Sequence, residues 1–150
     1  QLITTELSRY PALAGRGGER LTLMLPEVQI STHLKLAQAF RLKMSNLGVM
    51  VGLDQFGGGL GGHGVDPAQI LSHFGADRLR LVPELVEGLV EPAKAAGVRE
   101  LLSSIKAQKR EILAGGVEGA STMSALFNAG VDYAQGTFLA YVSSKMDHEF

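Results

Sequence analysis

The sequence predicts an α/β fold built on a parallel sheet. Its apolar residues change repeatedly from short continuous runs to helical spacing, which is typical of strands that alternate with helices. The runs are apolar throughout, as expected for strands covered on both faces. Strands joined by helices need right-handed crossovers, which make neighbouring strands parallel. This pattern fits a doubly wound sheet or part of a barrel, and spacing alone does not choose between them.

Five strand-helix units follow from the apolar runs and the capping residues. The predicted strands cover 21–25, 49–53, 79–82, 112–114 and part of 133–140. A helix capped by Ser31 follows the first strand and ends before Gly48. Asp66 and Pro67 start a second helix that ends at 73 or 74. A third runs from 91, or from just after Gly97, to about 109, and a fourth is capped by Ser121.

The composition limits the classes of function. The 150 residues allow one domain with a substantial core, and a net charge of -1 argues against general nucleic-acid binding. The absence of Cys excludes disulfides and thiolate metal sites. No apolar run approaches the ~20 residues that span a bilayer, and no signal peptide is recognisable. We therefore expect a cytoplasmic protein without a membrane span.

Three ordered motifs carry a resemblance to a known family. They are LDQFGGG (53–59), DRLRLV (77–82) and ILAGGVEGASTMSALFNAGVDYAQGTF (112–138). This order resembles the C-terminal part of the EAL domain, the cyclic di-GMP phosphodiesterase family, which shows DDFG-T-G, K-x-D, A-E-G-V-E and D-Y-x-Q-G. LTLMLPE (21–27) is similar to the family strand that carries E-x-T-E. The resemblance covers nearly the whole chain, so 1–150 is expected to be a single degenerate EAL-like domain.

The family fold is a TIM-barrel-like (β/α)8 domain with its site at the carboxyl ends of the strands. Five predicted units are fewer than eight, so the resemblance implies an incomplete barrel that corresponds to the C-terminal portion of the family domain. The strand that bears the E-A-L motif would lie before Gln1.

The resemblance also implies a loss of catalysis. Active members use two divalent cations, which need carboxylate and carbonyl ligands. The family positions for these ligands and for the lysine of K-x-D are occupied here by Met24, Gln55, Arg80, Val82 and Gly115, while Asp54 and Glu118 keep carboxylates. We expect no phosphodiesterase activity and no bound Mg²⁺ or Mn²⁺.

Within the family, the chain is most similar to receptors of the FimX type, which regulate type IV pili and twitching motility. The shared features are the Gln before Phe-Gly, VEGAS (117–121) and MDHEF (146–150). Such receptors bind cyclic di-GMP without cleaving it and act on a PilZ-type adaptor, which is one expected partner; a second copy of the chain is the other. The alternatives are an interaction domain that no longer binds nucleotide and a residual metal-dependent phosphodiesterase.

The predicted ligand site collects residues from four strand ends. Each candidate has two interpretations. The glycine-rich loop is expected either to bind phosphate or to be a flexible loop without a ligand. Asp54 is expected either to accept hydrogen bonds or to hold a cation. Arg80 contacts phosphate or pairs with Asp54 or Glu118. Glu118 orients ligand or caps a helix, and Gln135 lines the base pocket or bonds to the backbone. The full predicted set is Asp54, Gln55, Phe56, Gly57, Arg80, Glu118 and Gln135.

Overall fold

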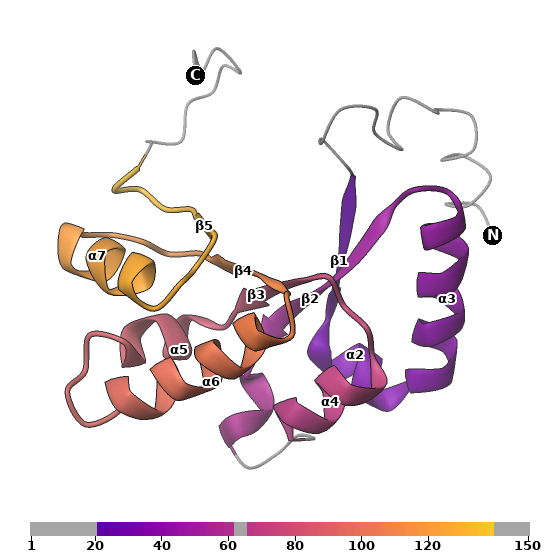
Figure 1. Cartoon of the computed structure of the whole chain (residues 1–150), viewed down its shortest axis with the longest axis horizontal. Coiled ribbons are helices and arrows are strands. Elements are labelled where there is room, and N and C mark those ends of the chain that lie inside the picture. Colours follow the sequence, from indigo (N-terminus) through magenta and orange to yellow (C-terminus); the bar gives the residue numbers. More distant parts are fainter. Residues whose placement is uncertain (1–20, 62–65, 140–150) are drawn as a thin grey trace.

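A curved, five-stranded parallel sheet organises the protein. The computed structural model describes residues 21–61 and 66–139. The sheet order is β1-β2-β3-β4-β5, so each strand pairs with its neighbour in the chain (Figure 1). The strands are β1 (Thr22–Pro26), β2 (Met50–Phe56), β3 (Arg78–Leu81), β4 (Glu111–Ala114) and β5 (Tyr133–Ala134). The predicted α/β class and parallel pairing are confirmed, and the barrel is not closed within the described residues.

Helices connect the strands along the outside of the sheet (Figure 1). They are α2 (Glu27–Thr32), α3 (Leu34–Asn46), the 3-10 helix η2 (Gly58–Gly61), α4 (Pro67–His73), α5 (Pro83–Gly88), α6 (Ala95–Ala107) and α7 (Ala120–Asn128). None of the helices in the described ranges is long and apolar enough to cross a membrane.

The helix starts correct several predictions. Asp66 caps α4 as predicted, because its carboxylate accepts a hydrogen bond from the Ala68 amide at 3.0 Å. The caps assigned to Ser31 and Ser121 are wrong. Ser31 lies inside α2, which begins directly after β1, and its hydroxyl donates to the Val28 carbonyl. Ser121 lies inside α7, which Gly119 precedes as N-cap.

The third predicted helix corresponds to α6, and a further helix, α5, that was not predicted precedes it. α5 starts at Pro83 immediately after β3, and α6 begins at Ala95, so neither predicted start is correct. Six residues of α5 are too few to show helical periodicity in a sequence, which explains why this helix was missed.

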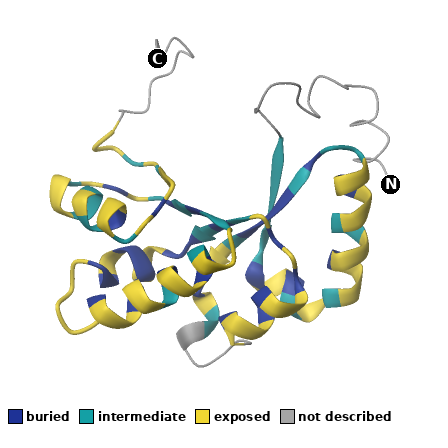
Figure 2. Cartoon of the chain, in the orientation of Figure 1, coloured by how far each residue is buried: buried dark blue, intermediate teal, exposed yellow. Residues whose placement is uncertain are grey.

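The two faces of the sheet differ in chemistry. Leu79, Leu81, Ile112 and Ala114 alternate along β3 and β4 and are buried against the helices. The intervening positions, which include Arg78 and Arg80, are half-buried on the other face. Figure 2 shows the buried residues concentrated where helices and strands meet. The face away from the helices therefore carries the polar groups.

Three predicted features lie outside the described residues. They are positions 62–64 of the glycine-rich loop, any part of the fifth strand beyond 139, and the 146–150 motif.

Candidate ligand site at the carboxyl ends of the strands

An irregularity in β2 directs Asp54 toward β3. Leu53 pairs with Leu79 and Phe56 pairs with Leu81, so β2 contains one more residue than β3 between the paired positions. This is a β-bulge, a feature that bends a strand and turns a side chain. Gln55 takes up the distortion with a φ of 55°, which is uncommon for a residue with a side chain.

Asp54 and Arg80 form a two-pronged ion pair across the bulge. Arg80 donates from Nε to Oδ1 at 2.8 Å and from Nη2 to Oδ2 at 2.6 Å. The Gln55 amide also donates to Oδ1, at 2.8 Å. The hydrogen bond from Arg80 lowers the pKa of Asp54, and the same bond raises that of Arg80. Of the alternatives for Arg80, the structure has the pair with Asp54.

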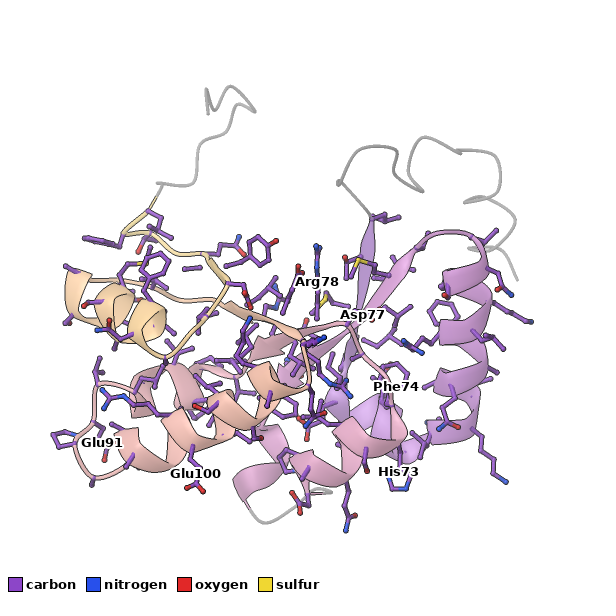
Figure 3. All side chains as sticks on the ribbon, in the orientation of Figure 1. His73, Phe74, Asp77, Arg78, Glu91 and Glu100 are labelled. Carbon is purple, nitrogen blue, oxygen red and sulfur yellow. The ribbon has the colours of Figure 1, made fainter. Side chains whose placement is uncertain are left out.

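A second guanidinium lies earlier on the same face of β3. Arg78 donates to the Glu111 carboxylate and to Thr22 Oγ1, the latter at 2.9 Å. Its guanidinium carbon lies 5.6 Å from the centre of the Tyr133 ring, a cation–π contact. Arg78, which is labelled in Figure 3, thus links β1, β4 and β5 across the sheet. Together the two arginines and their acidic partners form a charge-balanced band on the face of the sheet away from the described helices.

The loop after β2 is anchored by a buried carboxylate. Glu27 is 5% exposed, and its Oε2 accepts a hydrogen bond from the Gly57 amide at 2.6 Å. Burial raises the pKa of Glu27, an effect that the Gly57 and Gly59 amides partly oppose. The first residue after β1 therefore holds the first residue after β2.

Gly57 suits this position for two reasons. Its φ of 94° lies in the left-handed region, and a Cβ added there would lie 2.4 Å from Leu85 Cδ1 of α5. The loop thus passes so close to α5 that only a glycine fits. Phe56, beside it, has its ring fully buried in the core, and its carbonyl accepts from the Val82 amide at 3.0 Å. The ligand-binding roles of both residues stay predictions.

A cavity of about 580 Å³ opens beside this loop. It lies between α2, the loop and the start of α5, and the exposed Gln55 reaches it. Its lining residues are Glu27, Val28, Ser31, Thr32, Gln55, Gly58, Gly59, Val82, Pro83 and Glu84.

Glu118 and Gln135 lie farther along the same edge. The segments that carry them are joined through the backbone: the Val117 amide donates to the Gln135 carbonyl at 3.1 Å, and the Gln135 amide to the Ala114 carbonyl at 2.8 Å. Both side chains are exposed, and no hydrogen bond joins either to Asp54 or Arg80 in the described part of the chain. Glu118 does not cap α7, since the N-cap Gly119 is followed by a helix without a side-chain cap.

The side chains at the strand ends do not fit a pair of divalent cations. Both oxygens of Asp54 are already bonded to Arg80, and Met24, Val82 and Gly115 offer no carboxylate. Within 21–61 and 66–139, no three His, Asp or Glu side chains gather as a metal site.

Glu27 is the site residue that sequence reasoning missed. A signal was present, because Glu27 directly follows an apolar strand, and a glutamate is rarely buried without a partner. Its partner Gly57 is thirty residues away, so the pairing itself could not be inferred.

Comparisons with known proteins agree with this geometry. The EAL domain family model matches residues 7–141. The Xanthomonas citri FimX EAL domain, solved in complex with c-di-GMP, is 36% identical with a TM-score of 0.82; the match covers 99% of this chain and 55% of that one. The Pseudomonas aeruginosa FimX EAL domain bound to c-di-GMP is 22% identical, with a TM-score of 0.83 and coverage of 99% and 59%.

A more distant similarity involves the PaMucR phosphodiesterase in its c-di-GMP complex, at 20% identity and a TM-score of 0.69, with coverage of 81% and 48%. At 22% and 20% identity, likeness supports the fold alone. No curated protein matches the sequence. The chain spans between about half and three-fifths of these solved structures. The family match covers most of the sequence, and the chain belongs to the EAL domain family.

Proposed function

We propose that this chain is part of a catalytically inactive EAL domain that binds cyclic di-GMP without cleaving it and transmits the signal through protein contacts. The observation that carries the proposal is the Asp54–Arg80 pair. A guanidinium occupies both oxygens of the carboxylate that would otherwise be available to a cation. An EAL domain without a metal cluster lacks the means to activate water for phosphodiester hydrolysis.

Relatedness supports the choice of ligand. The X. citri FimX EAL domain, 36% identical, was solved with c-di-GMP. From the resemblance of the sequence motifs to FimX-type receptors we propose that the output is contact with a PilZ-type adaptor or a second copy of the chain, in the regulation of type IV pili. The cytoplasmic location expected from the sequence belongs to this proposal.

Calorimetric titration of the chain with cyclic di-GMP tests the proposal directly. We expect the same affinity in EDTA as in Mg²⁺ or Mn²⁺, because no metal takes part in binding. Chromatography of the mixture after incubation should show intact cyclic dinucleotide and no linear product.

Each of the two alternatives predicts a different result. Metal-dependent formation of the linear dinucleotide would contradict the inactive receptor and favour a residual phosphodiesterase. Absence of binding under all three conditions would contradict it in favour of an interaction domain that has lost its ligand.

A further inference from the structure

The helix-facing side of β1 is less well covered than that of β2. Leu23 and Leu25 of β1 are in register with Val51 and Leu53 of β2, so the four side chains share one face of the sheet. Val51 is 1% exposed and Leu53 is fully buried, whereas both leucines of β1 are only half-buried. Within the described residues β1 has a paired strand on one side alone. Its apolar side chains therefore lack a cover on the other side.

An apolar groove of about 580 Å³ lies beside this part of β1. It is formed where α2 and α3 meet the strand, at the β1 end of the sheet (Figure 1). Its apolar lining residues are Leu25, Ile30, Leu36, Ala37 and Phe40, and none of its described lining residues is Asp, Glu, Lys or Arg. Leu36 is 70% exposed. A single exposed leucine is ordinary, but one that continues a half-buried strand face is part of a larger apolar surface.

We propose that this groove is the docking site of residues 3–10 of the same chain, which cover the outer side of β1 with one apolar face. The proposal concerns how the domain is completed at this end of the sheet. It does not depend on the proposed ligand or on the residues of the candidate ligand site.

The sequence of this segment provides the apolar face. Ile3, Leu7 and Tyr10 are separated by four and three residues, a spacing that places them on one side of a helix. Thr5 falls on the opposite side. Pro11 follows directly, and helices usually end before a proline. The segment therefore matches the groove in character, because it offers a short apolar stripe to an uncharged apolar surface.

The connection to β1 allows this position. Ten residues, 11–20, separate the segment from Leu21, and Gly15, Gly17 and Gly18 among them favour a reversal of the chain. Ten extended residues span at most roughly 35 Å, and the five residues of β1 span about 16 Å. The segment can thus reach any point along β1. The family match begins at residue 7, which assigns residues 7–20 to the same domain as the sheet.

The groove is connected to the candidate site through α2. This helix lines the groove with Ile30, and it lines the cavity beside the loop after β2 with Glu27 and Ser31. A segment docked in the groove holds in place the helix that begins with Glu27. The cover on β1 therefore also supports the anchor of the loop.

Disulfide trapping tests the proposal in the full chain. The sequence has no Cys, so each pair of introduced thiols has a single intramolecular partner. The Leu7→Cys/Leu36→Cys variant is oxidised at low protein concentration, and mass spectrometry of a tryptic digest identifies the linked peptides. Thr5→Cys/Leu36→Cys is the matched control for the opposite side of the segment. Leu7→Cys/Phe127→Cys measures chance encounters, because Phe127 is exposed on α7.

We expect the pair at positions 7 and 36 to form an intramolecular disulfide several-fold faster than either control pair. A disulfide needs the two Cβ atoms to approach closely, which only the docked segment provides.

A stability measurement tests the same contact without thiols. Leu36 and Leu42 are both exposed on α3, at 70% and 64%, but Leu42 does not line the groove. Because residues 3–10 cover Leu36, Leu36→Gln should lower the midpoint of urea unfolding, and Leu42→Gln should leave it unchanged. Leu7→Gln should also lower the midpoint. The Leu7→Gln/Leu36→Gln variant should lose less than the sum of the two single losses, as expected for residues in contact.

The possible results discriminate among the occupants of the groove. A covalent dimer as the main product of the pair at positions 7 and 36 overturns the proposal in favour of a second copy of the chain. Equal rates for the Leu7 and Thr5 pairs, with equal urea midpoints for Leu36→Gln and Leu42→Gln, overturn docking of the segment altogether. Neither result affects the proposed function, because cyclic di-GMP takes no part in these measurements.

Discussion

The Glu27 carboxylate and the Gly57 amide nitrogen lie 2.6 Å apart, and this hydrogen bond ties the end of β1 to the loop after β2. Glu27 is nearly inaccessible to solvent, and the loop it holds also carries Gln55 and the cavity beside it. The shape of the candidate site therefore depends on the Glu27 carboxylate, which is removed from water in order to accept this hydrogen bond.

Glu27→Gln should increase stability at high pH. Burial raises the pKa of Glu27, so the folded state retains a proton at pH values where the unfolded chain has lost it. The stability from this proton is present at low pH and is lost as the pH rises through the folded-state pKa. Glutamine stays neutral, and its amide oxygen can still accept from Gly57. The melting temperatures of the two proteins should therefore diverge in favour of Glu27→Gln as the pH rises above the usual carboxyl pKa and through the raised pKa of the folded state.

Glu100→Gln is the control for this measurement, since Glu100 is exposed on α6 (Figure 3). It should leave the pH dependence unchanged. A Glu27→Gln variant that is less stable than wild type at every pH would mean that the ionised carboxylate is the preferred partner of the loop.

Asp54→Asn should change the stability of the protein at low pH, whereas Glu27→Gln changes it at high pH. Arg80 lowers the pKa of Asp54. The stability from the ionised carboxylate is thus present above its usual pKa and is lost as the pH falls through the lowered value. Because Arg80 is well exposed, the effect should be below about 1 kcal/mol. Acid unfolding followed by circular dichroism should show a flatter low-pH limb in Asp54→Asn, and an unaltered limb would refute the contribution of the pair.

Gly57→Ala should destabilise the protein through two separable causes. A residue with a Cβ costs about 1–2 kcal/mol in the left-handed region, and the added methyl would meet Leu85 Cδ1 at 2.4 Å. In the Gly57→Ala/Leu85→Ala double variant the steric part disappears and the backbone part persists. Urea unfolding should therefore give a double-variant loss smaller than the sum of the single losses. Strict additivity would show that Leu85 does not press on the loop.

Local signals in the sequence predicted the fold better than they predicted the site. Asp66 caps α4 because its acceptor and the Ala68 donor are two residues apart, so the signal is contained in the motif. Ser31 and Ser121 carry the same type of signal and fail, because the chain turns into helix earlier than either residue. Ser31 is the fifth residue of α2 and Ser121 the second residue of α7, so neither occupies the N-cap position from which a side-chain oxygen accepts from the first free N–H groups.

The contacts that build the site join residues distant in sequence. Arg80 was predicted as a site residue, with Asp54 as one of its alternative partners, but the choice depended on the bulge in β2. A bulge is a matter of register between two strands, which apolar periodicity does not report. Glu27 illustrates the same limit, since burial of its carboxylate becomes apparent only when the loop after β2 is in place.

Gly136→Ala should be among the most destabilising single-methyl additions in the described chain. A Cβ at this position would lie 2.2 Å from the carbonyl oxygen of Val117 and 2.3 Å from its amide nitrogen. The backbone cannot move aside cheaply, because the Val117 amide donates to Gln135 and its carbonyl accepts from Phe138, each at 3.1 Å. Overpacking of this kind costs about 1–3 kcal/mol or more.

Gly97→Ala is the matched control for Gly136→Ala, because it adds the same methyl group at a position with open space around it. Gly97 lies exposed in α6, and an added Cβ there meets nothing within 4 Å. Alanine should raise the free energy of unfolding by about 0.5–1 kcal/mol, because it restricts the unfolded chain and favours helix. Urea unfolding of the two variants should thus shift in opposite directions. If Gly136→Ala were as stable as wild type, the strand ends that carry Glu118 and Gln135 would not be held together by the Val117 backbone, and the edge of the site would be looser than these hydrogen bonds imply.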